Sequence, residues 1–344
     1  MKIRNFQRSY YDSSVKEYVN SVPKFPMVSV CIQAYEHALY IDECIQSVLS
    51  QKIDFEIEIL IGEDLSSDKT REICISYAKR YPKLIRLFLH DRSNNIKINN
   101  ISTGRFNLLY NLASANGKYI ALCDGDDYWK DEYKLKSQLK ICQQNDYSVV
   151  VSDYFYQYGE QLINPKKLSY SRHCDYVKLL AYHIPEDIYH FSHTSALFFD
   201  RKLLEKIFCE SWTYKAWGLD TVLIPLFFEH GNIYYLNKKT VVYRIRKGGN
   251  SSIKEQGPGD IHKFKYIQFT ALKNKYPIFK RNITYEQNIA MIKYFTRSLD
   301  FSIIRYFLLS VYFMLNKGNI KFLKNELKKM IQNSRNKLQD YIKY

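Results

Sequence analysis

Three aspartates crowd together after an apolar run in residues 119–129, which read YIALCDGDDYW. Asp124, Asp126 and Asp127 repel one another, so a cation is expected beside them. Carboxylate oxygens suit a hard divalent cation such as Mn²⁺ or Mg²⁺, which binds phosphate oxygens at the same time. Such a cation neutralises the charge that develops on a departing diphosphate. The three residues therefore favour transfer of a group away from a diphosphate.

The first half of the chain alternates strand-like and helix-like patterns, which is typical of an α/β fold with a mostly parallel, Rossmann-like sheet. Strands are expected at 28–34, 57–62, 84–89, 119–123 and 148–153, with helices between them at about 68–80 and 105–115. Later strands are expected at 195–199, 233–236 and 241–245. Residues 248–260, rich in Gly and Ser, form the clearest linker. We expect a catalytic domain at 1–255 and a basic helical region at 256–344.

Acidic residues follow several of the expected strands, where ligands bind in open α/β sheets. Glu36 follows the first strand, and Glu63 with Asp64 follows the second. Asp68, a little further on, is expected to cap a helix or shape a turn. Lys97 and Arg105 precede the DGDD strand, and solvated surface positions are expected for both.

The formal charge of +16, from 51 Lys and Arg against 35 Asp and Glu, favours an anionic partner or surroundings. Seven cysteines without a CxxC pair indicate reduced, buried thiols in a cytosolic protein. The N-terminus has no apolar segment of the signal-peptide type. The most apolar later stretch, from Phe301, is too short to span a membrane and contains Arg305.

Five motifs in order resemble family 2 of the inverting glycosyltransferases, whose nucleotide-sugar-binding fold is called GT-A. The motifs are VSVCIQAYEHALYIDECIQSVLSQ, EILIGEDLSSDKTREI, GKYIALCDGDDYW, WGLDT at 217–221 and YRIRKGGNSS. The resemblance covers residues 27–252 and implies a GT-A fold with a C-terminal helical extension.

The resemblance also implies roles for individual residues. Ala34, Tyr35 and Glu36 would line the nucleoside pocket, and Asp64 would hydrogen-bond the base. Asp124 and Asp126, with Asp127 beside them, would hold the metal and the ribose or diphosphate. Asp220 would be the catalytic base; otherwise it caps a helix that starts at Thr221. Apart from the resemblance, His193 precedes an expected strand and would either contact the acceptor or be a structural histidine. Trp212, Tyr214 and Trp217 would either stack on a sugar ring or pack in the core.

The sequence departs from the family pattern at four positions. Members commonly carry Thr and Asn where this chain has Ala34 and Glu36, and aspartate where it has Glu63. Leu65 replaces a frequent glycine, which limits the turn's freedom to adopt positive φ. No Gln-x-x-Arg-Trp segment of the processive polymer synthases is present. We therefore expect a metal-dependent, hexosyltransferase-type enzyme that adds a single sugar, from UDP by resemblance, to a glycan or lipid-linked glycan in surface polysaccharide synthesis.

Two other functions remain open at this point. A sugar nucleotidyltransferase has a related fold but needs a Gly-rich, basic phosphate loop, whereas this chain reads QAYEHALY there. A basic nucleic-acid-binding protein fits the charge, but carboxylates at the strand ends would repel a phosphate backbone. We therefore expect no nucleic-acid partner.

The C-terminal region combines an apolar helix face, formed by Ile320, Leu323, Leu327 and Ile331, with eight Lys or Arg residues from Asn316 onward. That combination suits an anionic membrane surface, and equally a face packed on the catalytic domain. A cytoplasmic protein at the inner face of the plasma membrane is expected.

Overall fold

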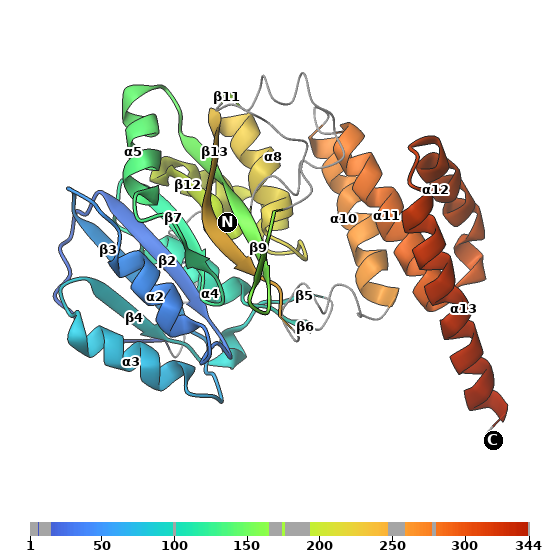
Figure 1. The fold of residues 1–344 in the computed structure, drawn as a ribbon, viewed down its shortest axis with the longest axis horizontal. Coiled ribbons are helices and arrows are strands. Elements are labelled where there is room, and N and C mark those ends of the chain that lie inside the picture. The colour runs from blue at the N-terminus through green and yellow to red at the C-terminus, as the bar shows by residue number, and fades with distance from the viewer. Residues whose placement is uncertain are drawn as a thin grey trace. The chain divides into compact units, whose positions relative to one another are not determined.

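The structure, a computed structural model, describes Phe6 and residues 15–98, 101–164, 174–175, 193–246, 259–276 and 280–342. The described residues form two compact units, one up to Ile245 and one from Arg246 onward. The first unit holds a large sheet with helices on its faces, and the second consists of helices (Figure 1). The expected linker at 248–260 lies almost wholly outside the described residues.

The first unit is built on a mixed sheet whose central strands are parallel. Its order in space is β1-β4-β3-β2-β7-β12-β9-β13-β11, with β10 beside β9 and β8 beside β13. Neighbours from β4 to β7 are parallel, β12 runs antiparallel to both β7 and β9, and β9 is parallel to β13. The strands are β1 (Lys16–Glu17), β2 (Val28–Ala34), β3 (Ile57–Glu63), β4 (Ile85–Leu89), β7 (Tyr119–Asp124), β8 (Tyr128–Trp129), β9 (Val149–Tyr158), β10 (Gln161–Ile163), β11 (Cys174–Asp175), β12 (Leu197–Asp200) and β13 (Ile233–Arg244). A separate small sheet pairs β5 (Lys97–Ile98) with β6 (Ile101–Ser102).

Helices cover both faces of this sheet (Figure 1). They are α2 (Ile41–Leu49), α3 (Thr70–Arg80), α4 (Arg105–Ser114), α5 (Lys134–Gln144), α7 (Leu204–Cys209) and α8 (Asp220–His230). One core contains alternate residues of β2, such as Val30 and Ile32, with Ile41 and Ile45 of α2 and Leu135 of α5. β2 is buried on both faces: Val28, Val30, Ile32 and Ala34 alternate with Ser29, Cys31 and Gln33, and all of these except the half-buried Gln33 are buried.

Two asparagine side chains of α4 form hydrogen bonds to backbone carbonyls near the ends of β3 and β2. Asn107 Nδ2 donates to the carbonyl oxygen of Gly62 at 2.7 Å, and Asn111 Nδ2 donates to that of Ile32 at 2.9 Å. A Cβ atom on Gly62 would lie 1.8 Å from Asn107 Oδ1, so a larger residue at this position of β3 would displace the Asn107 side chain.

The predicted elements are confirmed, with a few corrections to their bounds. The two strands expected at 233–236 and 241–245 are one strand, β13, whose pairing with β9 shifts register between Leu236 and Val241. Polar residues at that bulge interrupt the apolar pattern, which is why the sequence suggested a break. Helix α3 begins at Thr70, not at Asp68. Six cysteines are free thiols, and Cys209 is the exposed one among these six: Cys31, Cys44, Cys74, Cys123, Cys142 and Cys209.

The second unit contains α10 (Gly259–Lys275), α11 (Lys280–Ser298), α12 (Ile304–Asn316) and α13 (Ile320–Ile342). Its core gathers Ile292 and Phe295 of α11, Phe307 and Met314 of α12, and Leu323 of α13. Within the described residues, no helix has the length and apolar character needed to cross a bilayer.

Candidate active site

The loop after β2 and the turn after β3 hold each other in place through hydrogen bonds. The Glu36 amide donates to Ser66 Oγ at 3.1 Å, and the Ser67 amide donates to Glu36 Oε1 at 2.7 Å. Asp68 accepts from the amides of Ala38 and Thr70 at 3.0 and 2.9 Å. Burial raises the Asp68 pKa, but these hydrogen bonds outweigh it and leave the pKa below its ordinary value. Asp68 is thus a turn-forming residue, as predicted.

Two residues of these turns adopt a left-handed backbone. Glu36 has φ 54° and Leu65 has φ 56°. Leu65 therefore takes the positive φ that a glycine would adopt at lower cost, and its side chain is 43% exposed. Leu65, in place of the glycine frequent in the family, therefore adopts the same kind of turn conformation at the cost of local backbone strain.

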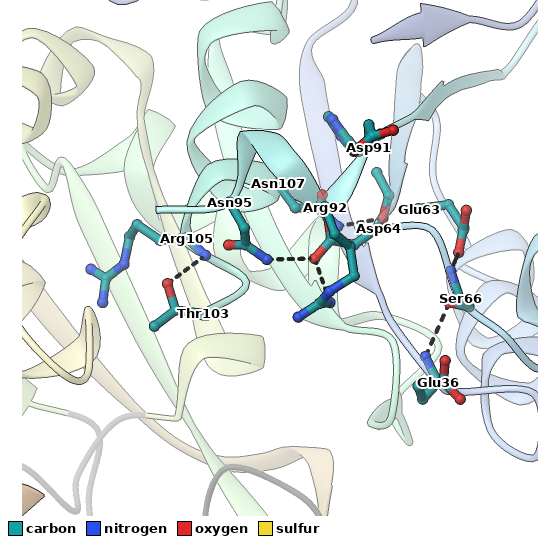
Figure 2. Close-up of polar contacts among 12 residues, drawn as sticks. Glu36, Glu63, Asp64, Ser66, Asp91, Arg92, Asn95, Thr103, Arg105 and Asn107 are labelled. Carbon is teal, nitrogen blue, oxygen red and sulfur yellow. Dashed lines mark hydrogen bonds and ion pairs between the residues drawn. The ribbon is translucent and has the colours of Figure 1, made fainter. Parts of the chain in front are cut away.

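Glu63 ends β3 and is fully buried. It pairs with Arg71 and accepts a hydrogen bond from the Ser66 amide at 2.7 Å (Figure 2). Its carboxylate is therefore engaged in forming the turn.

Asp64 follows β3 directly and is 1% exposed. Its Oδ2 accepts hydrogen bonds from Arg92 Nη1 and Asn95 Nδ2, each at 3.0 Å (Figure 2). Burial raises the pKa of Asp64 to about 6, although the positive charge of Arg92 opposes the rise. The described residues donate no hydrogen bond to its other oxygen, Oδ1. At pH 7 Asp64 is therefore mostly ionised, with one oxygen able to accept an N–H from a ligand.

The other predicted nucleoside-pocket residues differ in exposure. The Arg92 guanidinium lies over the Tyr35 ring, 3.7 Å from its centroid, and Tyr35 is 39% exposed. Ala34, in contrast, is fully buried with its methyl group in the core, and its carbonyl accepts from the Asp64 amide at 3.0 Å. At the end of β2, Ala34 thus contributes its backbone carbonyl and not its side chain.

Asp127 is completely buried and lies at the centre of a polar network. Its Oδ2 accepts from Ser195 Oγ at 2.6 Å and lies 3.2 Å from His193 Nδ1, while its Oδ1 accepts from the Arg244 amide at 3.1 Å. Ser195 Oγ in turn accepts from the Asp124 amide at 3.0 Å. Burial first, then the charges of Asp126 and Asp124, raise the pKa of Asp127 well above its ordinary value. Burial and the two neighbouring carboxylates thus make a negative charge on Asp127 unfavourable, and a nearby cation would relieve this cost.

Asp124 and Asp126 are half-buried at the same strand end. Asp126 Oδ2 lies 3.7 Å from His37 Nε2, and the Gly125 amide donates to Gln33 O at 2.9 Å. A Cβ atom on Gly125 would come within 2.7 Å of both Gln33 O and His37 Nδ1. Because glycine has no Cβ atom, the turn at residue 125 packs directly against β2, with Asp124 and Asp126 on either side of it in the chain.

Three side chains at this place could ligate a metal ion together. Asp124, Asp127 and His193 each offer one atom, and these atoms lie within 4.8 Å of one another. Carboxylate and imidazole donors suit Mn²⁺ well, and carboxylates suit Mg²⁺. The donor set and the clustering of three carboxylates at this strand end both fit a divalent cation.

Arg244, at the end of β13, completes the surroundings of the DGDD turn. Its Nη1 donates to the carbonyl of Asp126 at 3.0 Å, it pairs with Glu43, and its guanidinium lies over the Tyr128 ring at 4.5 Å. Arg244, although it lies 118 positions after Asp126 in the chain, thus stabilises the turn through a hydrogen bond to its backbone, an ion pair and a cation–π contact.

Asp220 begins α8, whose N-cap residue is Leu219, so the alternative reading of Asp220 as the cap is wrong. The preceding loop is held by Arg105, which donates to the carbonyls of Thr213, Ala216 and Trp217 at 2.9, 2.7 and 3.3 Å. Arg105 is 5% exposed, and burial lowers its pKa to about 10 against the opposing charge of Asp220. The prediction of a solvated Arg105 is wrong, because those carbonyls replace water; Lys97 is exposed as predicted.

The site residues predicted from the sequence did not include Asn95, Ser195, Arg244 or the buried Arg105. Arg244 lies in the quoted YRIRKGGNSS motif and Ser195 in the SHTSALFF segment, which were the available signals. The network brings His193 to Asp127, whereas Trp212, Tyr214 and Trp217 are half-buried in the loop that precedes Asp220.

A family model and several curated proteins match the sequence of this chain. The family model described as "Glycosyl transferase family 2" matches residues 29–208. The minor teichoic acid biosynthesis protein GgaB of Bacillus subtilis is 29% identical over 271 residues, which are 76% of this chain and 27% of GgaB. The chain spans about a third of the length of the first curated relatives, three mycobacterial proteins of 36% identity.

Solved structures share the fold at low sequence identity. TarS residues 1–349 of S. aureus, in complex with UDP-GlcNAc, matches with a TM-score of 0.58 at 15% identity, covering 92% of this chain and 91% of that one. The mannosyltransferase PcManGT of Pyrobaculum calidifontis, in complex with GDP-Man and Mn²⁺, matches with a TM-score of 0.54 at 14% identity, covering 98% and 94%. These likenesses establish the glycosyltransferase fold.

Proposed function

Because this chain belongs to family 2 of the glycosyltransferases, we propose that it moves a single sugar from a nucleoside diphosphate sugar to a hydroxyl group, with inversion at the anomeric carbon. The observation that carries the proposal is the pair of acidic sites at one sheet edge. Asp64, whose Oδ1 accepts no hydrogen bond from the described residues, follows β3, and the DGDD turn follows β7, with β2 lying between β3 and β7. A base at the first site and a diphosphate at the second would span that edge.

The donor would be held mainly by the residues after β2 and β3. Asp64 Oδ1 would accept an N–H of the base, while Tyr35 and Glu36, with the backbone of Ala34, would line the nucleoside. Arg92 supports this arrangement because it contacts both the Tyr35 ring and Asp64 Oδ2. We propose uridine diphosphate as the carrier; the complex of TarS with UDP-GlcNAc supports that choice.

Mn²⁺ or Mg²⁺ would bind at the DGDD turn. Asp124 and Asp126, with Asp127 beside them, would hold it with the ribose or diphosphate. His193 would be a further ligand, because its ligand atom lies within 4.8 Å of those of Asp124 and Asp127. The cation would neutralise charge on the diphosphate leaving group. The complex of PcManGT with Mn²⁺ supports a divalent ion of this kind.

Asp220 would act as the general base. Its carboxylate takes the proton of the acceptor hydroxyl while that oxygen forms a bond to the anomeric carbon. The bond from that carbon to the diphosphate oxygen breaks on the opposite side, and the electron pair leaves with the nucleoside diphosphate. Arg105 would position Asp220 through the loop carbonyls that it binds.

For the acceptor, we propose a bacterial surface glycan or its lipid-linked precursor, as the name of GgaB suggests. Transfer would take place in the cytoplasm at the inner face of the plasma membrane. The first unit would carry the donor site and the base, and the second unit would be a helical extension.

Calorimetric titration with UDP, GDP, CDP and dTDP, with and without Mn²⁺, tests the donor site. We expect Mn²⁺-dependent binding of UDP that Asp126→Ala weakens at least about tenfold, because the cation that would bind the diphosphate loses a carboxylate ligand. Asp146→Ala, an equal change at an exposed position, is the matched control. Absence of binding to every diphosphate would refute the proposal.

Product analysis tests the reaction itself. Asp220→Asn should keep UDP affinity and lower turnover at least about 100-fold, since it removes the base and leaves the donor site intact. Release of pyrophosphate from UTP and a sugar 1-phosphate would instead identify a nucleotidyltransferase.

A further inference from the structure

The two last helices of the second unit expose a group of large apolar side chains. The core of this unit takes Phe307 and Met314 from α12 and Leu323 from α13, and the opposite sides of both helices face outward. The exposed apolar residues, called here the apolar stripe, are Leu308 (57%), Leu309 (57%), Tyr312 (67%), Leu315 (49%), Ile320 (51%), Leu327 (40%) and Ile331 (51%). Seven large side chains on two consecutive helices exceed the scattered apolar residues usual on a protein surface.

The helical spacing places these residues on continuous faces. On α12, Leu308, Tyr312 and Leu315 follow one another at intervals of four and three residues, with Leu309 adjacent. On α13, Ile320, Leu327 and Ile331 lie at intervals of seven and four. Leu323, which the sequence analysis assigned to the same face, is buried instead, so the predicted α13 face is divided between core and surface.

The charges around the apolar stripe have one sign. In residues 304–332, the cationic side chains are Arg305, Lys317, Lys321, Lys324, Lys328 and Lys329, and all six are exposed. The acidic residue of this segment, Glu326, is 3% exposed. It accepts from Arg297 Nη1 at 2.9 Å and from Lys329 Nζ at 3.0 Å. The fold thus turns negative charge inward and leaves the outer surface of the two helices positive.

Lysines lie within the apolar stripe as well as beside it. Lys324 is four residues from Ile320, and Lys328 is three residues from Ile331, so both share the outward side of α13. Long lysine side chains can extend their amines to a charged surface while their methylene groups accompany buried neighbours.

We propose that the α12–α13 pair docks on an anionic lipid bilayer. The apolar stripe enters the boundary between headgroups and acyl chains, and the exposed cations other than Lys329, which pairs with Glu326, contact lipid phosphates. The large aliphatic residues favour a bilayer over a nucleic acid, whose phosphate backbone offers them no apolar contact. The absence of exposed carboxylates in 304–332 matches a surface of uniform negative charge better than a mixed protein surface.

Vesicle sedimentation with the full chain tests this docking. We expect binding to vesicles that contain 30% phosphatidylglycerol in phosphatidylcholine, much weaker binding to pure phosphatidylcholine, and a decrease as salt is raised. The double variant Leu309→Ser with Tyr312→Ser should lower the partition coefficient at least about tenfold, because two exposed apolar groups no longer insert. Lys324→Glu with Lys328→Glu should lower it by a similar factor on anionic vesicles only.

Matched controls separate docking from folding and from donor binding. Ile163→Ser on β10 and Lys140→Glu on α5 change exposed residues of the first unit and should leave vesicle binding unaltered. Urea unfolding of the same preparations shows whether each variant is folded, and UDP titration tests the proposed function separately. Equal affinity of the folded protein for both vesicle types, or no effect of either double variant, would overturn the docking proposal.

Two further outcomes would also overturn it. The first is vesicle-independent self-association that Leu309→Ser with Tyr312→Ser abolishes in sedimentation velocity. The second is binding of duplex DNA in preference to anionic vesicles at the same ionic strength.

Discussion

The substitution Asp64→Asn should stabilise the protein while it impairs donor binding. The pKa of Asp64 is raised from 3.8 to about 6, chiefly by burial. Between these two values the folded state binds more protons than the unfolded state, so the free energy of unfolding falls as pH rises through that window. Above pH 6 the folded protein carries the whole cost of an ionised, buried carboxylate.

The size of this cost follows from the pKa difference. At 1.36 kcal/mol per pKa unit, the ionised carboxylate costs about 3 kcal/mol at pH 8 and about 1.5 kcal/mol at pH 5. Asparagine has no such cost. Its Oδ1 can take the place of Asp64 Oδ2, which accepts both Arg92 and Asn95, so both hydrogen bonds survive.

Urea unfolding of wild type and Asp64→Asn between pH 5 and 8 measures the effect. The advantage of the variant should grow by about 1.5 kcal/mol across this range and approach about 3 kcal/mol at pH 8. UDP affinity should fall at least about tenfold, because the amide presents a donor where the base N–H needs an acceptor.

Asp68→Asn is the matched control, since the same chemical change occurs in the same turn. The pKa of Asp68 lies below its ordinary value, so loss of its charge should destabilise the protein above pH 4. An Asp64→Asn variant less stable than wild type at pH 8, or a gain that does not change with pH, would refute the reasoning. Either result would mean that Arg92 and Asn95 fully offset the free-energy cost of burying the ionised Asp64 carboxylate.

Three more substitutions address the turns and loops of the site. Leu65→Gly should raise the free energy of unfolding by about 1 kcal/mol in urea titration, because glycine adopts φ 56° without steric cost; a loss of stability would show that Leu65 makes a compensating contact. Ser195→Ala should weaken Mn²⁺-dependent UDP binding about tenfold in calorimetry, since Asp124 and Asp127 lose their shared hydroxyl, and unchanged affinity would contradict this role. Arg105→Met should cost about 3 kcal/mol in urea unfolding, because three buried carbonyls lose their donor; a cost below about 1 kcal/mol would mean that water replaces the guanidinium.

The amino-acid sequence by itself determined the strand ends and their acidic residues. An apolar run such as VSVCIQA or YIALC predicts a strand buried on both faces, and in a parallel sheet such strands end at one edge. Asp64, Asp124 and Asp126 could therefore be assigned to one edge from local pattern alone.

The tertiary structure alone decided which groups surround those carboxylates. Ser195 and Arg244 reach Asp127 because β12 inserts between β7 and β9 and because β13 pairs in parallel with β9, and no local pattern encodes such long-range pairing. The pKa of Asp64 likewise depends on burial and on Arg92 and Asn95, which lie in a polar segment that reads as an ordinary loop. The inward turn of Glu326 is also a packing result, because helical periodicity gives the faces of α13 and only contact with α11 decides which of them is buried.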